Sequence, residues 1–130
     1  MIILAIKTDK PVAEVYIYKN HEKLAAKSWQ AQGTLADTIN AKIEKMLDSL
    51  SISLKDIEGI ICFAGPGSFT GLRTGMAVAN ALAYAQNIPV VATKGENWID
   101  QGIRNLQAGK NQKIVTPNYD RPAATTIAKK

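Results

Sequence analysis

Residues 65–75 read GPGSFTGLRTG, and they stand between an apolar run at 57–63 and an alanine-rich segment that continues to Gln86. A glycine turn that aims backbone amides off a helix N-terminus is a common anion site. The purely structural alternative is that the glycines supply backbone angles closed to other residues, while Ser68 or Thr70 caps the helix. Either way, the stretch predicts a strand, a turn and a helix. The candidate residues of this glycine loop are Gly65, Gly67, Ser68, Thr70, Gly71 and Arg73.

The loop is not of the Walker A type, because its glycine spacing differs and no Lys-Ser or Lys-Thr pair follows the glycines. An autonomous nucleoside triphosphatase is therefore disfavoured. The sole histidine, His21, lies in a polar turn, and the sole cysteine, Cys62, lies in an apolar run. We expect neither a metal site at His21 nor a nucleophile at Cys62.

Hydrophobic periodicity predicts the other elements. The first three strands should form an antiparallel meander, and the fourth should run parallel to the first. This order is typical of an α/β layered domain with a mixed five-stranded sheet. Strands are expected at 2–6, 13–18, 23–30, 57–63 and 88–92, with a further possible strand at 113–115, and helices at 34–50, 70–86 and 96–106.

Length and composition favour one domain, since 130 residues with 46% hydrophobic content can bury a core without crosslinks. No charged leader or long apolar run begins the chain, which predicts a cytoplasmic protein without a membrane segment. The net charge of +5 comes from the second half, where basic residues outnumber acidic ones.

The glycine loop and the following MAVANALAYAQNIPVVAT resemble the TsaB (YeaZ) family, a subunit of the bacterial machinery that makes threonylcarbamoyladenosine in tRNA. The similarity extends back to the strand at 2–6 with Thr8, and it returns in the PNYDRPA of residues 117–123. It implies a ribonuclease H-like lobe of the actin and sugar-kinase superfamily at 1–93. Residues 94–130 would then be a shortened remnant of a second lobe and a C-terminal tail.

The resemblance implies a non-catalytic scaffold subunit for synthesis of N6-threonylcarbamoyladenosine at tRNA position 37. Its partner would be a TsaD-like catalytic subunit in a heterodimer, with a homodimer when the chain is alone and a TsaE-like ATPase as a further member of the complex. Contact with tRNA would be indirect or weak, through phosphate and basic side chains. No catalytic, cofactor-binding or metal-ligating residue is assigned. Family members carry an aspartate where this chain has Lys7, and a lysine cannot ligate Mg²⁺.

The helix at 70–86 carries two apolar stripes, although a surface helix needs one. The second stripe is covered either by the helix at 34–50 or by a partner. In the family, both helices of this lobe pack against the same pair in the partner. The predicted partner-binding residues are Leu72, Gly75, Met76, Ala79, Leu82, Ala83, Ile39 and Ile43.

Two alternative functions stay open. One is a minimal nucleotide-binding phosphotransferase that uses the glycine loop, which Lys7 disfavours. The other is a self-associating homodimer whose helix interface is regulatory.

Overall fold

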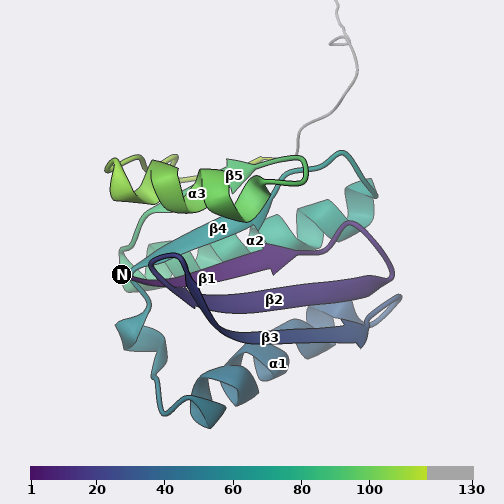
Figure 1. Cartoon of the computed structure of the whole chain (residues 1–130). Helices are drawn as coiled ribbons and strands as arrows, with labels where there is room; N and C mark the ends of the chain where they lie inside the picture. The colour runs from purple at the N-terminus through teal and green to yellow at the C-terminus, as the bar shows by residue number, and fades with distance from the viewer. Residues whose placement is uncertain (117–130) are drawn as a thin grey trace, which may run out of the picture.

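A computed structural model describes residues 1–116, apart from the side chain of Phe69, and in this part the strands form one mixed sheet. The sheet has five strands in the order β3-β2-β1-β4-β5 (Figure 1). β1 pairs antiparallel with β2 and parallel with β4, so the predicted meander and the predicted parallel strand are both confirmed. The strands are β1 (Ile2–Lys7), β2 (Val12–Lys19), β3 (Glu22–Gln30), β4 (Gly59–Phe63) and β5 (Val90–Thr93).

Helices cover both faces of the sheet. α1 (Leu35–Ser49) and α2 (Phe69–Gln86) pack on one face, around a core that contains Leu4, Ile6 and Ile60. α3 (Trp98–Gln107) packs on the other face, beside Ile61 (Figure 1). β4 is buried along its whole length because it lies between these two layers. The predicted α/β, ribonuclease H-like architecture is confirmed.

Local details differ from the expected ones. Thr34 precedes α1 as predicted, but its side chain makes no capping hydrogen bond. Residues 54–56 form a short 3₁₀ helix, η1 (Leu54–Asp56), which the periodicity did not predict. In α3, Gly102 packs directly on the sheet, because a Cβ there would lie 2.5 Å from Ile61 Cγ2. This close approach explains why glycine, a residue of low helix propensity, stands inside α3.

The expected strand at 113–115 is wrong, because residues 110–116 form no strand. This segment, here named the edge strap, closes the free edge of β5 with side-chain and backbone hydrogen bonds. Val90 N donates to Asn111 Oδ1 at 3.1 Å, and Gln112 N donates to Val90 O at 2.9 Å. The strap then crosses to α2, where Asn80 hydrogen bonds to both N and O of Val115, at 2.8 and 3.1 Å. Side-chain oxygens of Asn111 and Gln112 and the backbone N–H of Gln112 thus satisfy backbone groups of β5 that a sixth strand would otherwise pair.

Candidate functional site

The N-terminus of α2 lies directly against the end of β1. Thr8 Oγ1 donates a hydrogen bond of 2.7 Å to the carbonyl oxygen of Gly71. A Cβ at Gly71 would lie 2.0 Å from Thr8 O, and one at Gly75 would lie 2.2 Å from Thr8 Oγ1. Both glycines are therefore required by the close approach of helix and strand. Ser68 is the N-cap of α2, and its Oγ accepts from Gly71 N at 3.5 Å.

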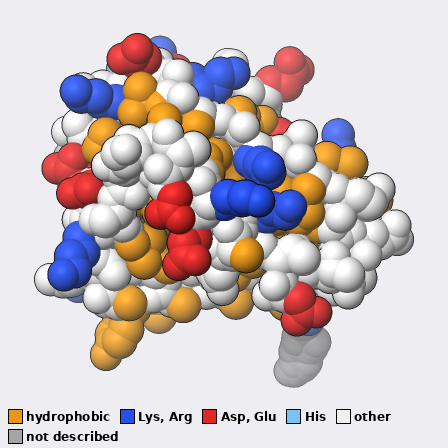
Figure 2. Space-filling model, turned by 90° about the horizontal axis from the view of Figure 1, so that it is seen from below, with side chains coloured by type: hydrophobic (Ala, Val, Ile, Leu, Met, Phe, Trp, Pro, Cys, Tyr) orange, Lys and Arg blue, Asp and Glu red, His pale blue; other side chains and the backbone are white. Residues whose placement is uncertain are grey.

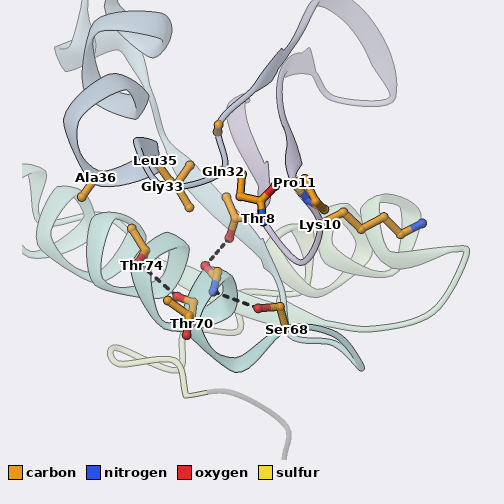
Figure 3. A pocket seen from close by; sticks show the side chains of 12 residues that line it. Thr8, Lys10, Pro11, Gln32, Gly33, Leu35, Ala36, Ser68, Thr70 and Thr74 are labelled. Carbon is orange, nitrogen blue, oxygen red and sulfur yellow. Dashed lines mark hydrogen bonds between the residues drawn. The ribbon is translucent and has the colours of Figure 1, made fainter.

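A cavity of about 480 Å³ opens beside this contact, between the end of β1, residues 31–36 and the first turns of α2 (Figure 3). Thr8, Ser68, Thr70 and Thr74 bring hydroxyl groups to it, and Lys10 lies at its margin. Three of these four hydroxyls already have backbone partners. Besides the bonds of Thr8 and Ser68 given above, Thr74 Oγ1 donates to Thr70 O at 3.1 Å. Three of the predicted loop residues, Ser68, Thr70 and Gly71, thus line the cavity. Gly65, Gly67 and Arg73 do not line it.

The end of β1 carries a buried ion pair that sequence reasoning missed. Lys7 Nζ lies 2.6 Å from Asp9 Oδ1, and the two side chains are 15% and 7% exposed. The Lys7 ammonium also lies over the ring of Phe63, 4.6 Å from its centroid. Gly67 packs on Asp9, because a Cβ at Gly67 would lie 2.4 Å from Asp9 Cβ. The sequence signal for this ion pair was the spacing of Lys7 and Asp9, two residues of opposite charge on either side of Thr8 at the end of a strand.

These groups do not fit a metal or a nucleophile. Asp9 already has a cationic partner, and no cluster of three His, Cys, Asp or Glu within the described residues could hold a metal ion. Burial raises the pKa of the Cys62 thiol to about 12, so the sulfur stays protonated at neutral pH. His21 lies in the β2–β3 hairpin, 3.6 Å from Asp100, and far from the glycine loop in the fold.

Most of the predicted partner-binding residues lie in the core. Leu72, Met76, Ala79 and Ala83 of α2, with Ile39 and Ile43 of α1, are each at most 3% exposed. Gly75 is buried against Thr8. Since these positions pack within the chain, the structure corrects the assignment: they cannot meet a partner while the fold is kept. Leu82 is half-buried at the groove between α1 and α2 and stays a candidate.

A different side of α2 faces outward. It consists of Ala77, Ala81, Tyr84 and Ala85, and we name it the α2 outer face. Tyr84 is 90% exposed. No charged residue occurs between residues 74 and 93. That uncharged run was the sequence signal for this surface.

No helix in the described part of the chain is long and apolar enough to cross a membrane.

Comparisons with known proteins match the region that contains the glycine loop. Residues 29–95 match the family model "TsaD: tRNA N6-adenosine threonylcarbamoyltransferase". The chain is 27% identical to the tRNA threonylcarbamoyladenosine biosynthesis protein TsaB of Haemophilus influenzae, over 85% of this chain and 47% of that protein. It is 28% identical to the TsaB protein of Bacillus subtilis, over 91% of this chain and 44% of that protein.

A solved structure is similar in fold. YeaZ from Pseudomonas aeruginosa superimposes with a TM-score of 0.68 at 24% identity, over 83% of this chain and 49% of that chain. The chain spans about half the length of the curated relatives it matches. The residues that match the family model, 29–95, include α1, β4, α2 and β5. They therefore contain both the glycine loop and the α2 outer face.

Proposed function

Because the chain belongs to the TsaB (YeaZ) family, we propose that it takes part in the biosynthesis of threonylcarbamoyladenosine in tRNA as a non-catalytic scaffold subunit. It binds a TsaD-like threonylcarbamoyltransferase by helix packing and holds that enzyme in its active arrangement. Catalysis, nucleotide binding and metal ligation belong to the partner.

The α2 outer face carries this proposal. Ala77, Ala81 and Ala85 recur every four residues on an exposed helix, so another helix can approach the backbone closely. Tyr84 projects beside them, and tyrosine is enriched where proteins bind one another. The absence of charge along the stripe removes the desolvation cost that charged groups impose on a buried contact.

The end of β1 supports the non-catalytic part. A metal-bound nucleotide needs a carboxylate free to coordinate the cation. Asp9 instead lies in a buried ion pair with Lys7, and Gly67 of the loop packs on its side chain. Near the cavity, the hydroxyls of Thr8, Ser68 and Thr74 hydrogen bond to backbone groups of α2 and not to a general base.

The test is co-expression with the threonylcarbamoyltransferase subunit of the same genome, followed by gel filtration with light scattering. A stable one-to-one complex is expected. Ala81→Arg places a charge in the middle of the apolar contact and should weaken the complex at least about 100-fold. Ala108→Arg is the matched control, because Ala108 is exposed at the C-cap of α3 on the opposite side of the sheet.

Failure to bind the enzyme, or equal binding by Ala81→Arg and the wild type, contradicts the proposal. Isothermal titration gives a separate outcome. Micromolar binding of Mg-ATP by the isolated chain would favour the phosphotransferase alternative, with the glycine loop as its site.

A further inference from the structure

β3 forms one edge of the sheet, and within residues 1–116 no strand lies on its outer side. Ala31 N donates to Pro11 O at 2.8 Å, so the backbone of Ala31 faces the β2 side. Backbone direction alternates along an antiparallel strand, which turns the N–H and C=O groups of Ala26, Ser28 and Gln30 away from β2. The edge strap closes the β5 edge, whereas these groups have no backbone partner in the described part of the chain.

Basic and aromatic side chains lie beside this edge on the α1 face of the sheet. Lys27 is paired with Val15, whose side chain belongs to the core under α1, so both side chains are on that face. Trp29 follows on the same face, and its Nε1 donates to Thr38 Oγ1 of α1 at 3.0 Å. Lys42 Nζ lies 5.9 Å from the centroid of the Trp29 ring.

The charges on this face have one sign. Lys45 lies three residues after Lys42, on the same side of α1, whereas Glu44 and Asp48 line the groove toward α2. Within residues 1–116, no ion pair involves Lys27, Lys42 or Lys45. Figure 2 is seen from below the view of Figure 1, where β3 and α1 lie, and shows basic side chains gathered near its middle.

The opposite face of the same edge is hollowed. A cavity of about 230 Å³ lies there, and its lining includes Val12, Tyr16, Ala26 and Ser28. The carboxylate of Glu14, also in the lining, accepts a hydrogen bond from Tyr16 OH. Because the β3 side chains here are small, an apolar side chain on an added strand would fit over the hollow.

We propose that the β3 edge binds an acidic, extended peptide segment of a partner protein as a sixth strand. The outward backbone groups of Ala26, Ser28 and Gln30 pair with the segment. Its carboxylates lie on the α1 face, near Lys27 and Lys42, and its apolar residues lie over the hollow. A second copy of this chain fits less well, because paired β3 edges would turn the lysine-bearing sides of two α1 helices toward each other.

The probe is a ten-residue peptide of alternating valine and glutamate with blocked ends, titrated at low salt into the nitrogen-15-labelled chain. The NMR amide signals of Ala26, Ser28 and Gln30 should shift most. Ser28→Pro removes a donor that faces away from β2, a position where edge strands tolerate proline. This variant should keep its circular dichroism spectrum and bind the peptide at least about 10-fold more weakly. Ala81→Arg, on the α2 outer face, should bind like the wild type, which separates this site from the proposed function.

Charge reversal tests the lysines. Lys27→Glu/Lys42→Glu should weaken binding by about 10-fold or more, because attraction becomes repulsion at two positions. The same variant should gain affinity for a peptide of alternating valine and lysine. Lys55→Glu/Lys110→Glu is the matched control, since it changes the net charge equally at exposed lysines in η1 and after α3. It should keep the wild-type preference for the acidic peptide.

Several results overturn the proposal. These are no binding at millimolar peptide, amide shifts confined to another surface, wild-type affinity in Ser28→Pro, or equal losses in the charge-reversed variant and its control. Concentration-dependent dimerisation that shifts the same amides without peptide would assign the edge to a second copy. Bulk tRNA that shifts these amides and displaces the peptide would assign the lysines to RNA.

Discussion

Gly75→Ala should destabilise the fold, although helix propensity alone predicts the reverse. Inside a helix, alanine is favoured over glycine by about 1 kcal/mol. At this position, however, the new methyl would lie 2.2 Å from Thr8 Oγ1 and 3.2 Å from Thr8 Cβ and Cγ2. Overpacking of a buried contact costs about 1–3 kcal/mol. Thr8 follows a strand held between two neighbours, so it has little room to move. Because the 2.2 Å contact is severe, we take the upper part of that cost, about 2–3 kcal/mol, and expect a net loss of about 1–2 kcal/mol.

Urea unfolding followed by circular dichroism measures the change as a lower midpoint at constant slope. The partner variant is Thr8→Ala, which removes two of the clashing atoms but also the hydrogen bond to Gly71 O, and should cost about 1 kcal/mol. In Gly75→Ala/Thr8→Ala the two losses should not add, with a coupling of about 1 kcal/mol or more. A higher midpoint for Gly75→Ala, or strict additivity in the double variant, would refute the close approach of α2 and β1.

Three further predictions follow from burial and charge. Ala79→Arg should abolish the native circular dichroism spectrum because Ala79 is fully buried, whereas Ala81→Arg should keep the spectrum and the unfolding midpoint. Cys62 should resist a thiol reagent at pH 8 in the native chain, because its pKa of about 12 leaves almost no thiolate. In urea it should react fully. Rapid labelling of the native chain would contradict the burial of Cys62. Lys7→Met should lower the free energy of unfolding by about 2–4 kcal/mol, because it leaves the Asp9 carboxylate buried without its cation. Lys7→Met/Asp9→Asn should recover most of that loss. Equal stabilities of the two variants would argue against the ion pair.

Elements with a strong repeat were predictable from the sequence. Apolar and polar residues alternate in β2, and β4 is a continuous apolar run; both patterns are typical of strands, and the structure confirms both. The stripe of α1 was equally clear, since Ile39, Ile43 and Met46 face the core. The family resemblance is also confirmed by comparison with known proteins.

Other features depend on which surfaces meet, and periodicity cannot supply that. Two stripes on α2 could each face the sheet or a partner, and the structure places Leu72 and Ala79 inside. The Lys7–Asp9 pair forms because the chain turns back after β1, and the edge strap follows from the exposed edge of β5. The division of the chain at residue 94 and the packing against a TsaD-like partner stay predictions.

The position of β1 in the sheet has a consequence for synthesis on the ribosome. β1 pairs on one side with β2, which follows closely, and on the other with β4, which comes much later in the chain. At about 5–20 residues per second, translation from Gln30 to Phe63 takes roughly 2–7 s. During that interval the nascent meander presents β1 with an unpaired, apolar edge. Chaperones that recognise extended hydrophobic segments would find their target in this window, and a pause in translation between β3 and β4 would prolong it.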